Sequence, residues 1–308
     1  MDILTTISGY IASDIRMATP ILFAALGLLL LNCSGIRFIG VEGVMLMAAL
    51  TAVFGSYITG NVWLGFCLAI IVGGVMGALY AFLTVSLRAN QTVIGQAFNL
   101  ISIGISSTLF RTVFGKTTLT PKVDTFQNLN LPLLSEIPIL GSTLFNHMLP
   151  VYFAFLLVPI ISFILLKTPI GLNLRSVGEK PEVSDTLGID VYKTRYISTI
   201  IGCMLMAMGG AFLSTGLLRF FSEGMVSGRG FIAVAAVVFG KHKPKGILIA
   251  TLLFGAGSVA ANVLQTLGTG IDYNIPVMIP YLLTIIVLAG FTGKVYPPAA
   301  LGKPYKKG

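Results

Sequence analysis

The chain has 308 residues, of which 55% are hydrophobic and 10% are charged, with a net charge of +9 at neutral pH. A water-soluble fold of this size must keep enough polar surface to face water, so this composition excludes one. The basic residues punctuate apolar runs and form no stripe with interleaved aromatic residues. This distribution argues against nucleic acid as a partner and indicates contact with membrane lipids.

Apolar segments follow one another along most of the chain. A transmembrane helix needs about 20 mostly apolar residues. The stretch 3–15 is shorter and more polar, so it is either a tilted span or an interfacial helix. We therefore predict an all-α, polytopic membrane protein in one transmembrane domain over residues 1–308, with about nine or ten transmembrane helices. The expected spans are 17–36, 42–59, 64–87, 92–114, 148–166, 196–218, 230–240, 246–264 and 276–292.

The loops between these segments divide the charges unequally. Most of the 20 Lys and Arg residues fall in alternate loops: Arg37, Arg88, 167–195, 241–245 and 294–307. Basic loops stay on the cytoplasmic side of a membrane. We expect these five segments to lie together at the inner, cytoplasmic end of a multi-pass membrane protein.

A weak internal repeat relates the two halves. Glu42-Gly43 opens an apolar helix ending in Phe-Gly, and Arg229-Gly230 opens another that also ends in Phe-Gly. The loop after the first helix is uncharged and the loop after the second is basic, so the halves, about 17–114 and 196–293, have opposite topology. Inverted repeats are common in transporters. Glu42 and Arg229 stand at equivalent positions, where they either form a gate or structural pair or anchor helix ends.

Polar side chains cluster on the fourth expected span. Gln96 and Asn99, three residues apart, share one helix face. An unpaired amide costs several kcal/mol in hydrocarbon, roughly, so these groups face either neighbouring helices or a water-filled solute pathway. The candidate pathway residues are Asn90, Gln91, Gln96, Asn99, Ser102 and Ser106.

The longest charged segment, 167–195, contains a short predicted helix over 178–188. Pro181 suits a first turn, Glu182 and Asp185 favour the positive end, and Gly188 can terminate the helix. Val183 and Leu187 share one apolar edge. The segment is either a solvated connector or a docking element for a cytoplasmic partner. The candidate docking residues are Gly178, Glu179, Pro181, Glu182, Val183, Asp185, Leu187 and Gly188.

The sequence carries no recognisable catalytic constellation. Gly115-Lys116-Thr117 has Phe110 where a phosphate-binding loop needs its first glycine. Cys33, Cys67 and Cys203 lack CxxC spacing and are expected to be small buried hydrophobes. We therefore expect no catalytic residue, no metal site and no cofactor in this chain.

Several of these stretches together resemble one family. Residues 174–181 (LRSVGEKP) followed by 188–191 (GIDV) are similar to the coupling segment of permease subunits of bacterial ATP-binding-cassette importers. The branch is the one that handles simple sugars and nucleosides, within the branched-chain amino acid and ribose permease superfamily. Further matching stretches are 19–22, 40–46, 88–91, 228–232 and 280–283. The segment 126–145 carries no such match.

The resemblance implies a division of labour. A lipoprotein or periplasmic binding protein delivers the solute, this chain and a second permease, expected to be a different chain, form the pathway, and cytoplasmic ATPase subunits that bind ATP and Mg²⁺ drive it. The helix around 181–187 would transmit their movement. The alternative is an ion-coupled secondary transporter for a small polar solute, in which Glu42 would be the carboxylate that couples the ion.

Overall fold

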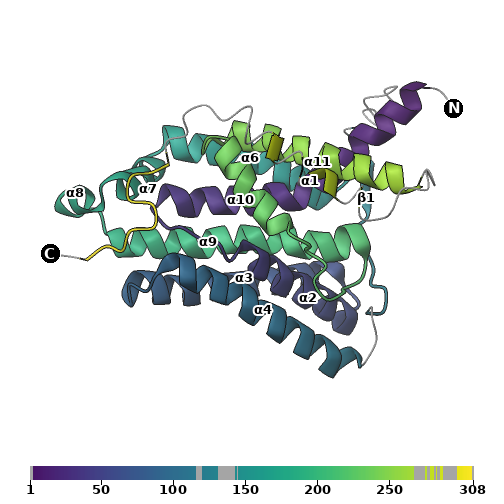
Figure 1. Cartoon of the computed structure of the whole chain (residues 1–308), viewed down its shortest axis with the longest axis horizontal. Helices are drawn as coiled ribbons and strands as arrows, with labels where there is room; N and C mark the ends of the chain where they lie inside the picture. The colour runs from purple at the N-terminus through teal and green to yellow at the C-terminus, as the bar shows by residue number, and fades with distance from the viewer. Residues whose placement is uncertain are drawn as a thin grey trace.

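The computed structural model describes residues 3–115, 120–130, 143, 145–266, 275, 278–280, 282, 285–286 and 297–306. Within these residues the protein is a helical bundle with one two-stranded hairpin at one end (Figure 1). The elements are α1 (Ile3–Cys33), α2 (Val41–Thr59), α3 (Val62–Ala81), the π-helix η1 (Phe82–Ser86), α4 (Gln91–Phe114), β1 (Asn128–Asn130), β2 (Asn146–Met148), α6 (Leu149–Lys167), α7 (Pro169–Glu179), α8 (Pro181–Thr186), α9 (Val191–Ala211), the π-helix η2 (Phe212–Leu218), α10 (Arg229–Phe239) and α11 (Pro244–Thr266).

The all-α, multi-pass prediction is confirmed. Among the described residues, seven helical segments are long and apolar enough to cross a membrane. They are Ile7–Cys33, Val41–Thr59, Val62–Ser86, Gln91–Phe114, Leu149–Lys167, Val191–Leu218 and Pro244–Thr266. The expected span 230–240 is the short helix α10, and the expected span 276–292 lies mostly outside the described residues.

The stretch 3–15 is no separate element, because it continues without a break into the first expected span. Together they form α1, a helix of 31 residues. At a rise of 1.5 Å per residue such a helix is about 46 Å long, well beyond the roughly 30 Å of a hydrocarbon core. Its N-terminal end accordingly projects from the bundle (Figure 1).

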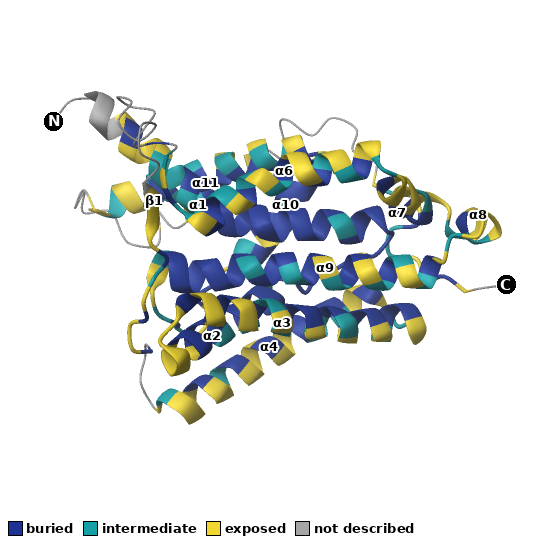
Figure 2. Ribbon diagram, turned by 180° about the vertical axis from the view of Figure 1, so that it is seen from behind, coloured by how far each residue is buried: buried dark blue, intermediate teal, exposed yellow. Residues whose placement is uncertain are grey.

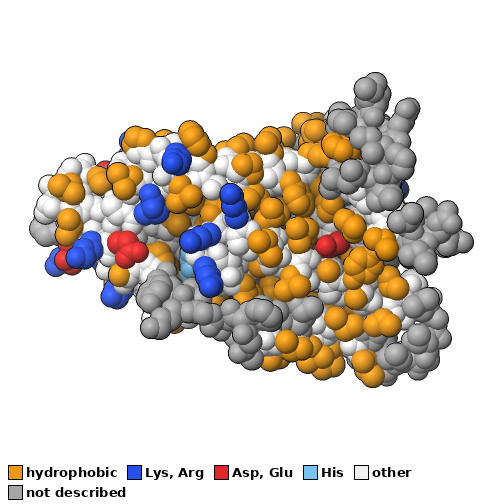
Figure 3. All heavy atoms as spheres, turned by 90° about the horizontal axis from the view of Figure 1, so that it is seen from above, with side chains coloured by type: hydrophobic (Ala, Val, Ile, Leu, Met, Phe, Trp, Pro, Cys, Tyr) orange, Lys and Arg blue, Asp and Glu red, His pale blue; other side chains and the backbone are white. Residues whose placement is uncertain are grey.

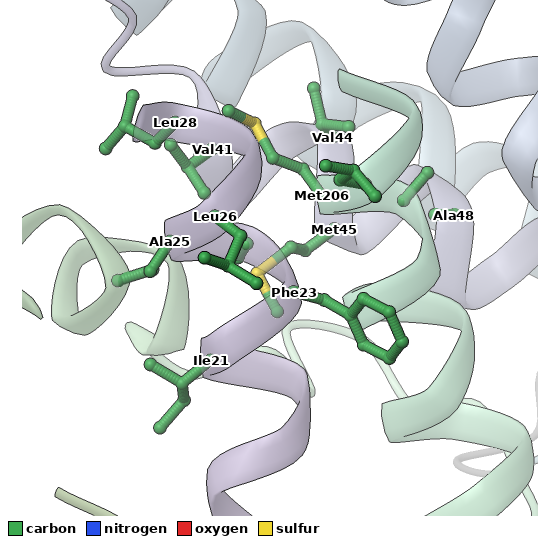
Figure 4. Close-up of a cluster of buried hydrophobic side chains, with 14 of the residues drawn as sticks. Ile21, Phe23, Ala25, Leu26, Leu28, Val41, Val44, Met45, Ala48 and Met206 are labelled. Carbon is green, nitrogen blue, oxygen red and sulfur yellow. The ribbon is translucent and has the colours of Figure 1, made fainter. Parts of the chain in front are cut away.

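The core of the bundle is built around α1, α2 and α9. These helices are buried over most of their length, whereas α4 and α6 are largely exposed (Figure 2). Fully buried Phe23, Leu26 and Met45 belong to one continuous apolar cluster with Met206 of α9 (Figure 4). The exposed side chains of α3, α4 and α6 are also mostly apolar, as expected for surfaces that face lipid or other membrane helices.

Close contact between α1 and α9 depends on two glycines. A Cβ atom on Gly27 of α1 would overlap the carbonyl oxygen of Gly202, and one on Gly202 would overlap the side chain of Leu31. The face of α3 that carries Gly73 approaches α9 equally closely, at the carbonyl of Cys203. Small residues of this kind let membrane helices pack backbone to backbone.

The two halves of the chain are interlocked. α1, from the first half, packs against α9, α10 and α11, while α9, the corresponding helix of the second half, packs against α1, α2 and α3. Each half thus contributes its first helix to the other half. An inverted repeat would give this reciprocal packing, and the division into two halves stays a prediction.

The basic segments meet at one end of the bundle. The Arg88 guanidinium contacts the Tyr192 hydroxyl, the Asn32 amide contacts His242, and the backbone N–H of Gly302 donates to the carbonyl of Gly35. Lys and Arg side chains gather toward the end that carries α8 and the C-terminus (Figure 3). We call this the inner end, in keeping with the expected orientation. The β1–β2 hairpin, antiparallel with Leu129 opposite His147, lies at the outer end.

The α1–α9 crossing generates a stability prediction. Gly27→Ala places a methyl group against the backbone of Gly202, so we expect a loss of about 1–3 kcal/mol from overpacking. Gly104→Ala on α4 is the matched control, because nothing lies within 4 Å of its added Cβ. Thermal unfolding of the purified protein in detergent measures both variants. Equal melting temperatures for the two variants would contradict the close approach.

Candidate functional site

The inner end carries two short helices, α7 and α8, that follow directly from the membrane helix α6. Thr168 caps α7, since its hydroxyl accepts the N–H of Gly171 at 3.3 Å, and Pro169 occupies the first turn. A Cβ on Gly171 would overlap the carbonyl of Ile164, so only glycine permits so sharp a turn. Leu174 and Val177 are buried on one face of α7. The remaining face of α7 is exposed or half-buried, which fits a helix lying at the inner surface of the bundle.

α8 forms the tip of this end (Figure 1). Pro181 begins it, and the hydroxyl of buried Ser184 donates back to the carbonyl of Lys180 at 3.0 Å. Gly188 follows with a left-handed φ of 83°, a conformation that glycine adopts without strain. The apolar edge predicted for this helix is present and open: Val183 is 51% exposed and Leu187 is 75% exposed.

The predicted single helix over 178–188 is wrong in one respect, because Lys180 separates two helices. Gly178 and Glu179 end α7 and contact the body of the protein. A Cβ on Gly178 would overlap the carbonyl of Cys33, and the Glu179 carboxylate accepts the backbone N–H of Ala299 at 3.2 Å. These two residues therefore anchor the tip, and the exposed docking candidates are Glu182, Val183, Leu187 and Gly188.

The amides of α4 hold neighbouring helices together. The Asn99 side chain accepts the backbone N–H of Gly43 at 2.9 Å and donates to the carbonyl of Ile39 at 3.2 Å. Asn99 is buried and its amide also reaches exposed Gln96, at 3.4 Å, so the two share a face as predicted. Ser102 is buried beside Gly43. Asn99 thus satisfies a free N–H in the first turn of α2.

Gln91 and Asn90, at the start of α4, form hydrogen bonds with nearby backbone groups. Gln91 is buried and its side-chain oxygen accepts the backbone N–H of Arg37 at 2.7 Å. The hydroxyl of fully buried Tyr80 also lies 2.7 Å from the carbonyl of Arg37. Asn90 is exposed and caps α4 by accepting the N–H of Thr92 at 3.0 Å. These contacts fix the segment that connects α1 to α2.

Glu42 links α2 to α10, the two helices that the predicted internal repeat places at equivalent positions. Its two carboxylate oxygens accept the backbone N–H groups of Gly228 and Gly230 at 2.7 and 2.8 Å. A carboxylate at this position satisfies free N–H groups of α10 and complements the positive end of its dipole. The Arg229 guanidinium attracts the same carboxylate and donates to the carbonyls of Met225 and Val226, both at 3.2 Å.

The length of α10 indicates how deep this contact lies. The helix has 11 residues and is followed directly by the basic 241–245 loop. At 1.5 Å per residue it extends about 16 Å from that loop, roughly half of a hydrocarbon core. Glu42 and the first turn of α10 are therefore inside the apolar layer, where a free N–H has no water to bind.

A cavity of about 300 Å³ lies on the outer side of this contact. Arg229 from α10, Arg16 from α1 and Arg219 after η2 all line it, and the rest of the lining is Ser13, Gly216 and the apolar side chains of Met17, Met148, Leu213, Leu217 and Leu218. Guanidinium groups donate hydrogen bonds and accept none. The cavity is therefore suited to an uncharged or anionic solute rich in acceptor oxygens, and it disfavours cations.

Sequence reasoning missed the positions of three residues: Arg195 and Tyr305 at the inner end, and Asp14 in α1. Arg195, placed in a basic loop, is 1% exposed and donates to the carbonyls of Ser34 and Lys303, each at 3.2 Å. Tyr305 in the C-terminal tail is buried beside Val177 and Val191. Asp14 lies within a candidate span, so Glu42 is not the sole acid there. No group of three or more metal-ligating side chains occurs among the residues that the structure describes.

Comparison with known proteins assigns the family. Residues 10–288 match the family described as the permease component of the branched-chain amino acid transport system. The guanosine ABC transporter permease protein NupQ of Bacillus subtilis is 36% identical over all of this chain and 99% of its own length. The putative glucose ABC transporter permease protein TsgC13 of Haloferax volcanii is 34% identical over 92% of this chain and 91% of its own.

A second guanosine permease protein of Bacillus subtilis, NupP, is 25% identical over 97% of this chain and 85% of its own length. No solved structure matches. The apolar helices define a multi-pass membrane protein. The chain belongs to the permease-component family of ATP-binding-cassette transporters, and it is a transport subunit and not an enzyme.

The two amides of α4 generate a prediction that separates the buried capping amide from the exposed one. Asn99→Leu leaves the N–H of Gly43 without a partner in an apolar environment, so we expect a loss of about 1–3 kcal/mol in stability. Gln96→Leu removes an exposed amide and should leave stability unchanged within about 0.5 kcal/mol. Thermal unfolding in detergent measures both. A melting temperature for Asn99→Leu equal to that of Gln96→Leu would contradict the capping role.

Proposed function

We propose that this chain is a permease subunit of an ATP-driven importer of nucleosides or simple sugars in a bacterial cytoplasmic membrane. The nucleoside and sugar permeases among its relatives support this substrate class. The importer would also contain a second permease, cytoplasmic ATPase subunits and a binding protein on the outer side. The match to both NupQ and NupP supports a second permease related to this chain.

The observation that carries the proposal is the exposed apolar edge of α8. Val183 and Leu187 are exposed at the inner tip of the bundle, on one edge of α8. Burying one such side chain is worth about 1.5–3 kcal/mol. We propose that an ATPase subunit covers this edge, with Glu182 at its rim, and moves α8 when it binds and hydrolyses ATP.

The solute pathway follows from the same residues. We propose that Asn90 and Gln96, the exposed amides, face the pathway or the second permease. Asn99, Gln91 and Ser102 would hold the adjoining helices in register. The arginine-lined cavity at the outer side would receive the solute, because its donors match the carbonyl and hydroxyl oxygens of nucleosides and sugars.

The competing proposal is an ion-coupled carrier that uses Glu42. Its carboxylate oxygens already accept two backbone N–H groups at the start of α10, which supports a helix-capping role over ion coupling. Glu42→Gln keeps one side-chain acceptor for these N–H groups. We therefore propose a structural role for Glu42 and Arg229, with gating limited to movement of the helices they join.

Energy coupling is tested with the complete transporter in lipid vesicles. Tritiated guanosine and glucose are the probes, offered with the binding protein present. We expect uptake of at least one probe when ATP is supplied on the side of the membrane where the ATPase subunits lie and no ion gradient is present. We expect the Glu42→Gln variant to retain this uptake. Uptake driven by a proton or sodium gradient without ATP, and lost in Glu42→Gln, would favour the ion-coupled carrier.

The contact with the ATPase is tested by one charge placed on α8. Leu187→Asp puts a carboxylate in the proposed interface, and we expect co-purification of the ATPase subunit to fall at least tenfold, because an unpaired buried charge costs several kcal/mol, roughly. Leu129→Asp is the control, since it makes the same change on an exposed residue at the outer end. Undiminished association of Leu187→Asp would remove α8 from the interface.

A further inference from the structure

The C-terminal tail, residues 297–306, crosses the inner end of the bundle and lies against α7, α8, α9 and the segment that follows α1. The backbone N–H of Ala300 donates to the carbonyl of Gly178 in α7, and that of Gly302 donates to the carbonyl of Gly35, both at 2.9 Å. Gly302 has a left-handed φ of 81° and a Cβ there would lie 3.3 Å from Arg37. The tail is therefore held by its backbone along its length.

Arg195 connects this tail to the two central helices. It belongs to the second turn of α9 and is almost fully buried. Its guanidinium donates to the carbonyl of Ser34, just after α1, and to the carbonyl of Lys303 in the tail. A buried guanidinium that lost these acceptors would be costly, so the three segments stay together.

Tyr305 connects the same tail to α8. Its ring is buried between Val177 of α7 and Val191 of α9, and lies 5.8 Å from the ring of Tyr192 in an edge-on arrangement. The carboxylates of Asp185 and Glu182 in α8 lie near its hydroxyl. Burial and these carboxylates raise the pKa of Tyr305, so the phenol stays protonated.

We propose that residues 299–305 act as a strap that fixes α8 to α1 and α9, with Tyr305 and Arg195 as its positioning residues. The inference rests on the proposed function, since it assigns a role to the strap in coupling. α8 is only six residues long and projects from the bundle, and its own connections run to α7 through Lys180 and to α9 through residues 187–190, so the strap adds the connection to the end of α1. With the strap in place, displacement of α8 moves the two central helices with it.

The strap also divides the acidic residues of α8 by role. Asp185 is half-buried and acts more strongly on Tyr305 than Glu182, which is exposed and can also face a partner subunit. We therefore expect a substitution of Asp185 to loosen the strap more than one of Glu182.

The test uses the complete transporter in vesicles and measures guanosine uptake per ATP hydrolysed. Tyr305→Phe removes the hydroxyl and keeps the ring, and we expect uptake per ATP to fall about fivefold, as the loss of one polar contact between the strap and α8 predicts. Tyr305→Ala removes both and should lower it further while ATP hydrolysis continues. Tyr57→Phe is the matched control, because Tyr57 is an exposed tyrosine of α2 near the outer end.

A distance measurement separates a mechanical role from a general loss of stability. Spin labels at Thr186→Cys on α8 and Lys245→Cys on α11, with exposed Cys67 changed to Ser, report how α8 sits on the bundle. We expect a narrow distance distribution in the parent and a broadened one in Tyr305→Phe. Wild-type uptake per ATP together with an unchanged narrow distribution in Tyr305→Phe would overturn the strap.

The two proposals fail in different ways. If Leu187→Asp leaves the ATPase subunit bound, the docking role of α8 is wrong, and the coupling role of the strap, which depends on it, is wrong as well. If Leu187→Asp releases the ATPase subunit while Tyr305→Phe keeps wild-type coupling, only the strap is wrong. If Tyr305→Ala does not assemble, Tyr305→Phe decides, since its buried ring is retained.

Discussion

Two helices of this protein begin close to one another inside an apolar layer, and their free backbone N–H groups must be satisfied there. Asn99 of α4 accepts the N–H of Gly43 in α2, and Glu42 of α2 accepts those of Gly228 and Gly230 at the start of α10. In hydrocarbon no water can replace these acceptors. The order of contacts, α4 to α2 to α10, therefore ties the two halves of the chain together at mid-depth.

This tie has a mechanical consequence. Glycines bring α1, α9 and α3 into backbone contact, so the central helices cannot slide past one another without steric overlap. At the inner end Arg195 and Tyr305 join the same helices to α7 and α8. A force applied at α8 is thus delivered to a packed body and not to a loose loop, as a permease that depends on a separate ATPase requires.

The sequence predicts the fold class well because apolar length alone identifies membrane helices, and it groups the inner loops because basic residues stay on one side. It predicts the existence of α8 from Pro181 and Gly188, and it places Gln96 and Asn99 on one face. The sequence-based prediction fails where contacts between residues distant in the chain determine which side chains are buried. Charge pattern placed Arg195 in a solvated loop, although its partners, Ser34 and Lys303, are distant in the chain.

The central claim is that α8 is the part of this permease that the ATPase subunit holds. A photo-crosslinking amino acid at Leu187, compared with one at Leu129 of the outer hairpin, tests it in the assembled transporter. The account predicts a crosslink from position 187 to the ATPase subunit and none from position 129. A crosslink to the ATPase subunit from position 129, or none from position 187, would contradict it.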